Sequence, residues 1–285
     1  MKRPFTLGAV AYDPKVVTIW EGFQRLVCRP RFRVRHVLFS AYEAQAEAHL
    51  AGLVDVTWDS PLAWVRNRRL AQAAGRPARA IVQRDSDQDL TSVVLVRADS
   101  GIDDVAQLRG LTVATGALDS PQATLLPLAH LATCGLEPDV DFTVRRFDVM
   151  VTKHGDHIGG ERGAVRALLA GDVDAACVID GNQLAFANDG TIPVGALRAL
   201  TRTPQYDHCT MTVLEGVDNA TVNRFVELLL SMSFEDPAVR PLLELEGLRE
   251  WREGRTVNYA PLEEAVDRLG FYGPDGAITV AGYGR

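Results

Sequence analysis

Two copies of the tripeptide Asp-Ser-Pro each follow an apolar stretch, at Asp59-Ser60-Pro61 and at Asp119-Ser120-Pro121. Asp and Ser are preferred N-cap residues, and Pro suits a first helical turn because its missing N–H would have no partner there. A helix that starts at a strand end presents N–H groups and a partial positive charge to a small anion. Ser120, Gln122 and Thr124 are therefore candidate ligand contacts, with an ordinary strand-to-helix turn as the alternative.

A polar insert, Thr152-Lys153-His154-Gly155-Asp156-His157, precedes Glu161. Imidazole and carboxylate groups at this spacing can hold a transition metal, close over a ligand as hydrogen-bond donors, or provide a general base. A glycine-flanked polar loop explains the same residues. We favour that loop because the sequence offers no second pair of metal ligands to anchor the insert.

The tripeptide Asp207-His208-Cys209 places a thiol next to an imidazole, a combination found in nucleophilic enzymes. Adjacent side chains on an extended strand point to opposite faces, so we do not expect His208 and Cys209 to pair. Three aromatic residues elsewhere, Tyr12, Trp58 and Tyr206, are candidates either for a wall around an organic ligand or for the core.

Strands and helices alternate along the chain, which is typical of α/β proteins with parallel strands. Strands are predicted over residues 5–11, 32–39, 54–58, 80–83, 92–96, 111–114, 142–147, 173–179, 196–201 and 209–214. Helices are predicted over residues 15–27, 41–51, 62–74, 102–108, 125–134, 161–170, 218–233 and 236–246.

An internal echo joins residues 50–60 (LAGLVDVTWDS) and residues 169–180 (LAGDVDAACVID). In each segment we predict the end of a helix, then a Val-Asp pair, a strand and a final polar residue. In open α/β sheets ligands bind beyond the carboxyl ends of the strands. The echo therefore predicts two similar lobes, each with polar groups at such an edge.

The bulk composition narrows the class of protein. The net charge is −7 over 285 residues and basic residues are interspersed with acidic ones, which disfavours a nucleic-acid partner. No apolar run is long enough to cross a bilayer, and the N-terminus lacks the apolar region of a signal peptide. We therefore expect a cytoplasmic protein, or a periplasmic or otherwise extracytoplasmic one whose leader was removed.

Two residue classes are expected to be structural. The four cysteines are widely spaced and predicted to be unpaired, with Cys134 and Cys177 in the core. Arg66, Arg68 and Arg69 lie on one predicted helix and are expected on its solvated face.

Four phrases occur in a fixed order: VDVTWDSPLAWV, LVRADSGIDDVAQLRGLTVATG, LDSPQATLLPLAHLATCGLEPDVDF and GAVRALLAGDVDAACV. With this order, residues 6–215 resemble the phosphate, phosphite and phosphonate substrate-binding proteins of ABC transporters. The resemblance implies the type II periplasmic-binding-protein fold, an α/β fold of two lobes, each a mixed sheet flanked by helices, with the ligand cleft between them. Lobe 1 is then residues 1–95 plus 200–285 and lobe 2 residues 96–199, with hinge strands near 91–97 and 195–203.

The resemblance also implies a ligand site at strand ends and helix starts. The implied contacts are Tyr12, Trp58, Asp59, Ser60, Ser120, Gln122, Thr124, Glu161, Arg162, Asp180, Tyr206 and His208. In the family, consecutive hydroxyl residues followed by Gly bind the phosphonate, whereas here Pro121, Gln122 and Ala123 follow Ser120. Carboxylates at Asp59 and Glu161 repel a dianion unless Arg162 or Lys153 compensates. We therefore predict a ligand that is anionic or zwitterionic and of phosphonate or carboxylate type.

Two functions follow from this reading. The first is a binding protein that closes two lobes on a small ligand, with an ABC permease as partner if it is exported. The alternative is a cytoplasmic enzyme on the same scaffold, with decarboxylase, dehydratase or lyase-type chemistry on a small organic acid. In the alternative, Glu161, His157 and His208 are the catalytic candidates. No metal and no cofactor are expected, and neither is a nucleic-acid partner.

Overall fold

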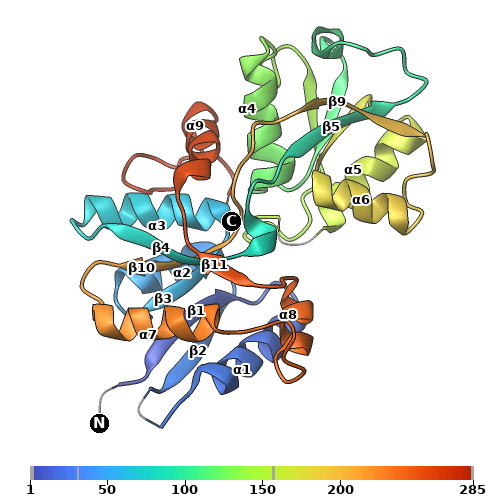
Figure 1. Cartoon of the computed structure of the whole chain (residues 1–285). Coiled ribbons are helices and arrows are strands. Elements are labelled where there is room, and N and C mark those ends of the chain that lie inside the picture. The colour runs from blue at the N-terminus through green and yellow to red at the C-terminus, as the bar shows by residue number, and fades with distance from the viewer. Residues whose placement is uncertain (1–2, 31, 156–157, 284–285) are drawn as a thin grey trace. The chain divides into compact units, whose positions relative to one another are not determined.

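The computed structural model describes residues 3–30, 32–155 and 158–283, and contacts between residues divide the chain into two compact units. Unit 1 comprises residues 1–88, 207–259 and 272–277, and unit 2 comprises residues 89–206, 260–271 and 278–285. Each unit contains a mixed β-sheet flanked by helices, which confirms the predicted fold class (Figure 1). The predicted lobe bounds remain a proposal; by contacts, residues 260–271 group with unit 2.

Within the described residues, the sheet of unit 1 has six strands in the order β11-β4-β10-β3-β1-β2. Their bounds are β1 Phe5–Val10, β2 Val34–Phe39, β3 Val56–Asp59, β4 Ala78–Arg84, β10 Thr210–Leu214 and β11 Trp251–Glu253. β1 pairs in parallel with β2 and β3, whereas β10 runs antiparallel between β3 and β4. The chain therefore inserts a strand from its C-terminal part into the middle of a sheet built by its N-terminal part.

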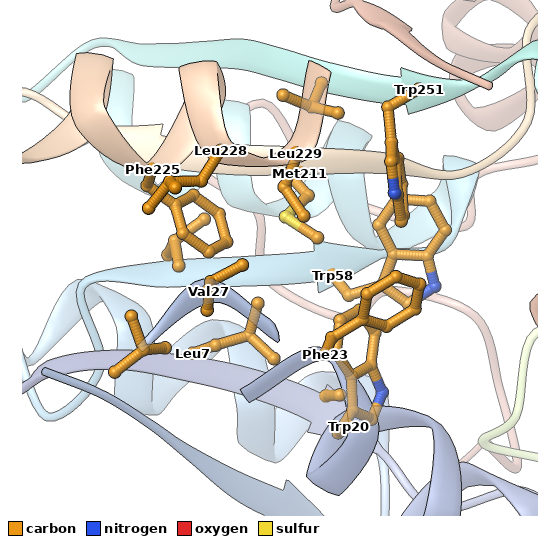
Figure 2. Close-up of a cluster of buried hydrophobic side chains, with 14 of the residues drawn as sticks. Leu7, Trp20, Phe23, Val27, Trp58, Met211, Phe225, Leu228, Leu229 and Trp251 are labelled. Carbon is orange, nitrogen blue, oxygen red and sulfur yellow. The ribbon is translucent and has the colours of Figure 1, made fainter. Parts of the chain in front are cut away.

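Helices cover both faces of this sheet (Figure 1). They are α1 Lys15–Val27, α2 Tyr42–Leu50, α3 Pro61–Ala73, α7 Asn219–Leu230 and α8 Arg240–Glu246. Side chains alternate along β1, so Phe5, Leu7 and Ala9 join a core with α1, α7 and α8, while Val10 packs against α2 and α3. Figure 2 shows the larger core, in which aromatic and aliphatic side chains fill the space between the sheet and its helices.

The sheet of unit 2 has five strands among the described residues, in the order β7-β6-β8-β5-β9. Their bounds are β5 Ser92–Arg97, β6 Thr112–Thr115, β7 Thr143–Arg146, β8 Ala175–Ile179 and β9 Leu197–Arg202. β6 pairs in parallel with β7 and β8, and β5 is antiparallel to β8 and β9. The two strands expected to act as hinges are thus β5 and β9, neighbours in one sheet.

Three helices pack on the sheet of unit 2: α4 Leu126–Thr133 on one face, and α5 Gly159–Ala170 and α6 Asp180–Asn188 on the other. A further helix, α9 Ala260–Arg268, contacts α4. Short 3₁₀ turns lie at Asp85–Asp87, Val105–Leu108 and Val257–Tyr259, and a π-helical turn at Pro121–Leu125. No helix among the described residues is both long and apolar enough to cross a membrane.

The predicted internal echo corresponds to one shared structural feature. β3 and β8 occupy equivalent places, each between a parallel strand and an antiparallel one. In unit 1 the Asp55 carboxylate accepts a hydrogen bond from the Thr6 N–H at 2.8 Å. In unit 2 the Asp174 carboxylate accepts one from the Thr112 N–H at 2.9 Å. The repeated Val-Asp pair therefore fixes the start of a neighbouring strand in both sheets.

Several local predictions were wrong. Arg66 and Arg69 were expected on a solvated helix face, but both are buried. They hold the C-terminal segment: Arg66 donates to the Gly276 carbonyl at 3.2 Å and Arg69 to the Tyr272 carbonyl at 2.8 Å. Cys134 is exposed because it ends α4, whereas Cys177 is buried as predicted, and no disulfide joins any of the four cysteines. β11, α6 and α9 were not predicted, because each is short and its pattern alone does not distinguish it from a loop.

Candidate functional site

The helix start at Ser120 forms as predicted, but it does so through a π-helical turn. The Ser120 hydroxyl accepts from the Ala123 N–H at 3.2 Å, and the Ser120 carbonyl accepts from the N–H groups of Thr124 and Leu125. The Ser120 N–H itself donates to the Ala117 carbonyl. The turn therefore satisfies several of its own donors, including two N–H groups that the sequence made candidates for an anion. The hydroxyl proton of Thr124 is also used within the turn, since it is donated to the Ala117 carbonyl at 2.8 Å.

The polar insert lies directly on this helix start. The side-chain amide of Gln122 donates to the Gly155 carbonyl at 2.9 Å. A Cβ on Gly155 would lie 2.4 Å from the Ser120 hydroxyl oxygen, so the two segments are in close contact. We refer to residues Thr152–Gly155 as the cover loop.

A buried carboxylate anchors the cover loop. One oxygen of Asp119 accepts from the N–H groups of Thr152 and His154, and from the Tyr283 hydroxyl at 3.2 Å. The other oxygen is buried and has no hydrogen-bond partner among the residues that the structure describes. Burial raises the pKa of Asp119, and the hydrogen bonds from the loop oppose this shift. The sequence identified Asp119 as a helix cap, and the structure makes it the anchor of the insert.

A set of polar groups gathers where β8 ends and β5 begins. The Ser92 hydroxyl donates to the Gln122 carbonyl and accepts from the Tyr206 hydroxyl at 2.8 Å. The Thr91 hydroxyl donates to the Asp180 carboxylate at 2.9 Å, and the Glu161 carboxylate accepts from the Ile179 N–H at 2.9 Å. We call this group the unit 2 polar cluster; its members are Thr91, Ser92, Gln122, Glu161, Asp180 and Tyr206.

The electrostatics of this cluster are dominated by carboxylates. Burial raises the pKa of Tyr206 well above its ordinary value, and the charges of Glu161 and Asp180 act in the same direction. Burial also raises the pKa of Cys177 to about 12, again with a contribution from Glu161. These charges therefore favour the neutral forms of Tyr206 and Cys177.

Arg162 does not join this cluster. Its guanidinium donates to the Asp189 carboxylate at 2.7 Å and lies 4.4 Å from the centre of the Phe186 ring. Asp189 caps the C-terminal end of α6, whereas Asp180 begins that helix. One of the two cations expected to compensate the carboxylates, Arg162, is thus engaged at the C-terminal end of α6.

The candidates of unit 1 are mostly part of its core. Trp58 is 5% exposed and packs edge-on against Trp20 and Trp251, as Figure 2 shows. The Asp59 side chain is fully buried and accepts from Gln45 at 2.9 Å and from Asn67 at 2.7 Å. Burial raises the pKa of Asp59 to about 6.

Two further candidates of unit 1 lie at strand ends. Ser60 is the N-cap of α3, and its hydroxyl accepts from the Ala63 N–H at 3.1 Å. Tyr12 follows β1 and is half-buried, with the Lys15 ammonium 6.0 Å from the centre of its ring. Of the three aromatic candidates, Tyr12 therefore presents the most accessible ring, since Trp58 and Tyr206 are buried.

The histidine candidates are separated along the chain. His154 is buried in the cover loop and His208 precedes β10 in unit 1, while His157 lies outside the described residues. The expectation that His208 and Cys209 do not pair was wrong, because His208 Nδ1 lies 3.1 Å from the Cys209 sulfur. The two residues lie just before β10, so the alternation of a regular strand does not apply to them.

Sequence reasoning missed Thr91 and Ser92 as site residues. Ser92 begins β5 and Thr91 directly precedes it, and the antiparallel pairing of Ser92 with Ile179 brings them to the carboxyl end of β8. The available signal was weak: two hydroxyl residues directly before an apolar strand.

Comparison with known proteins agrees with this architecture. Residues 23–259 match the profile of a family described as ABC transporter, phosphonate, periplasmic substrate-binding protein. A search of curated protein sequences found no match.

Solved structures of low sequence identity share the fold. PhnD1 from Prochlorococcus marinus, solved with methylphosphonate, has a TM-score of 0.67 and 16% identity over 93% of this chain and 98% of its own. XAC2383 from Xanthomonas citri, bound to ATP, has a TM-score of 0.70 and 19% identity over 94% of this chain and 98% of its own. The periplasmic aliphatic sulphonate-binding protein SsuA from Escherichia coli has a TM-score of 0.60 and 20% identity over 95% of this chain and 92% of its own.

Proposed function

The chain belongs to the phosphonate-type periplasmic substrate-binding proteins of ABC transporters, and we propose that its ligand is a small zwitterionic acid bound at the unit 2 polar cluster. The acid group is of phosphonate, sulfonate or carboxylate type, and the other end carries an ammonium group. The observation that carries this proposal is that Ser92 bonds both the Gln122 carbonyl and the Tyr206 hydroxyl, while the charges of Glu161 and Asp180 lie close enough to raise the pKa of Tyr206.

The acid end of the ligand is assigned to the helix start. The Gln122 amide donates to the Gly155 carbonyl, so this carbonyl marks a position at which a ligand oxygen can accept the same hydrogen bond. The Ser120 hydroxyl is a second donor there, because accepting from the Ala123 N–H leaves its own proton available. Ligand oxygens can reach both groups in one of two ways. Either the cover loop moves away from the helix start, or it stays and forms part of the wall around the ligand.

The ammonium end is assigned to the carboxylates. No member of the unit 2 polar cluster carries a positive charge, and the guanidinium of Arg162 is paired with Asp189. The carboxylates of Glu161 and Asp180 would repel a dianion such as an alkylphosphonate, whereas they would attract an ammonium group. The proposed ligand therefore differs by its ammonium group from the methylphosphonate bound by PhnD1.

The remaining parts of the proposal follow from the family. The partner is the permease of an ABC transporter, the site of action is the periplasm or its equivalent, and the two lobes close on the ligand. The relatives named above are binding proteins and give the enzyme alternative no support.

Isothermal titration calorimetry with matched ligand pairs tests the proposal. The pairs are methylphosphonate with aminomethylphosphonate and ethanesulfonate with taurine, which differ in the ammonium group alone. We expect binding of an amino compound and weaker binding, by about tenfold or more, of its alkyl partner, equivalent to about 1.4 kcal/mol. Equal affinities within each pair, or preference for the alkyl acids, would contradict the zwitterion assignment.

A pair of variants locates the ammonium subsite. Asp180→Asn removes the charge at the start of α6, and the control Asp172→Asn removes an exposed charge just after α5. The proposal predicts loss of affinity for the amino compound in the first variant and unchanged affinity in the second. If both variants bind like the parent protein, the ammonium group does not lie at Asp180.

A further inference from the structure

A second group of chemically competent side chains lies in unit 1, outside the proposed ligand site. Asp87 ends the 3₁₀ turn that follows β4, and His208 and Cys209 precede β10, the neighbour of β4 in the sheet. The His208 N–H donates to the Asp87 carbonyl at 2.7 Å, which holds the two segments together. Asp87 lies 121 positions before His208 and 122 before Cys209, yet the fold presents their carboxylate, imidazole and thiol to one another.

The ligand atoms of these three side chains form a compact triangle. His208 Nδ1 lies 3.1 Å from the Cys209 sulfur and 3.5 Å from Asp87 Oδ1, and all three atoms lie within 4.8 Å of one another. A tetrahedral zinc ion, with a Zn–S distance of about 2.3 Å and Zn–N or Zn–O distances of about 2.0 Å, spaces its ligands about 3.3 to 3.6 Å apart. We propose that Asp87, His208 and Cys209 bind a divalent transition-metal ion such as Zn²⁺.

The geometry favours a metal over a nucleophilic thiol. In a catalytic triad the two ring nitrogens have different partners, one the nucleophile and the other the carboxylate. Here the same nitrogen, Nδ1, faces both Cys209 and Asp87. Cys209 is also only 3% exposed, which suits a bound ion better than an approaching substrate.

The charges around the triangle are consistent with a divalent cation. Arg84 donates to both carboxylate oxygens of Asp87, at 2.6 and 2.8 Å, and to Glu246 at 3.3 Å. With a neutral thiol the group Arg84, Asp87, Glu246 has a net negative charge of one. A divalent cation and the thiolate it binds bring the total to neutrality.

Arg84 also has a place in the metal-bound state. A carboxylate oxygen has two lone pairs, so Oδ1 of Asp87 can bind the metal while it accepts from Arg84. Hydrogen bonds of this kind orient metal ligands and tune their affinity. A thiolate with an imidazole selects zinc, cobalt or copper over magnesium and calcium, which prefer oxygen ligands alone. Three protein ligands leave a fourth position for water.

Cobalt titration tests this site directly. The reduced, tag-free protein is titrated with Co²⁺ while the absorption that a thiolate transfers to bound cobalt is followed in the near ultraviolet. We expect one equivalent to saturate this band and Zn²⁺ to abolish it. The band should be absent from Cys209→Ser and retained in Cys134→Ser, a control that removes an exposed thiol.

A thermal measurement guards against misfolded variants. Zn²⁺ should raise the Tm of the parent protein and of Cys134→Ser, and it should leave the Tm of Cys209→Ser and His208→Asn unchanged. Circular dichroism checks that these two variants fold. If one of them does not fold, Cys209→Ala is used in its place. Absence of the cobalt band in the parent protein, or the same band in folded Cys209→Ser, would overturn the proposal. Neither readout requires a phosphonate, so the result is independent of the proposed function.

Discussion

The side-chain amide of Gln122 donates a hydrogen bond to the Gly155 carbonyl at 2.9 Å. This hydrogen bond holds the cover loop against the helix start at Ser120. Asp119 supports the same arrangement by accepting from two N–H groups of the loop. A ligand oxygen at Gln122 therefore competes with the chain's own carbonyl. The measured affinity then includes the free energy needed to move the cover loop.

Replacing Gly155 tests how tightly the cover loop is held. Gly155 has φ +73°, and an added Cβ would lie 2.4 Å from the Ser120 hydroxyl oxygen and 2.8 Å from the Gln122 amide nitrogen. Gly135→Ala is the matched control, since Gly135 has φ +85° and open space around its Cα. The backbone conformation costs about 1–2 kcal/mol in both variants, and the clash adds to it only in Gly155→Ala. Urea denaturation should thus show the larger loss for Gly155→Ala; equal losses would mean that the loop moves freely.

Asp59 makes the stability of unit 1 depend on pH. Its pKa rises from 3.8 to about 6 in the folded state because the carboxyl is buried, so the folded state binds the proton more tightly than the unfolded state. The resulting stabilisation is complete below about pH 4 and is lost as the pH rises through about 6. A shift of about two pKa units corresponds to about 3 kcal/mol.

The Asp59→Asn variant removes this titration. Denaturation midpoints of both proteins measured from pH 4 to pH 8 should show a decline in the parent protein between pH 4 and 6 that is reduced in the variant. The slope is the readout, because the new amide also changes the hydrogen bonds to Gln45 and Asn67. Parallel curves would show that Asp59 is ionised in the fold throughout this range.

Trp58 should contribute to stability rather than to a ligand-binding wall. It lies among Trp20, Trp251 and the guanidinium of Arg84, whose central carbon is 5.2 Å from the centre of its ring. Trp58→Ala leaves a cavity and should cost about 3–5 kcal/mol of unfolding free energy. Tyr12→Ala, at a half-buried position, should cost about 1 kcal/mol or less. Similar losses for the two variants in urea denaturation would contradict this placement.

The paired carboxylates Asp55 and Asp174 should have matching effects in the two units. Each accepts a hydrogen bond from the N–H of an adjacent strand, at 2.8 and 2.9 Å. Replacing either by Ala removes a charged acceptor and should cost about 1.5–3 kcal/mol. Asp172→Ala, at an exposed position, is the control and should stay within about 0.5 kcal/mol. Differential scanning calorimetry measures the loss of stability. If Asp174→Ala left the stability unchanged, the repeated Val-Asp pair would have no shared structural role in the two units.

Much of the fold was predictable because it rests on short-range patterns. Helix α1 begins and ends where the spacing of Val16, Ile19, Trp20 and Phe23 places it. The caps at Ser60 and Ser120 form as their residue types predict. The prediction was incomplete where an element depends on distant partners, as with β11, which pairs with β4 from the far end of the chain.

The candidate site was predicted less completely than the fold. The sequence identified Gln122, Glu161 and Asp180, which the structure brings into one cluster. It could not show that Arg162 turns to Asp189, or that Ser92 joins the cluster through an antiparallel strand. Side-chain partners on different elements are chosen by packing, and no local pattern encodes them.

The sequence by itself determined the fold class, the family resemblance and the helix start after Asp119-Ser120-Pro121, because propensity, capping and periodicity act between residues close in the chain. The tertiary structure alone decided that the insert covers this helix start, that Trp58 and Asp59 are buried, and that Asp87 meets His208 and Cys209. Those contacts join segments separated by tens of residues or more. Their free energies depend on burial and on the charges nearby, which exist only once the chain has folded.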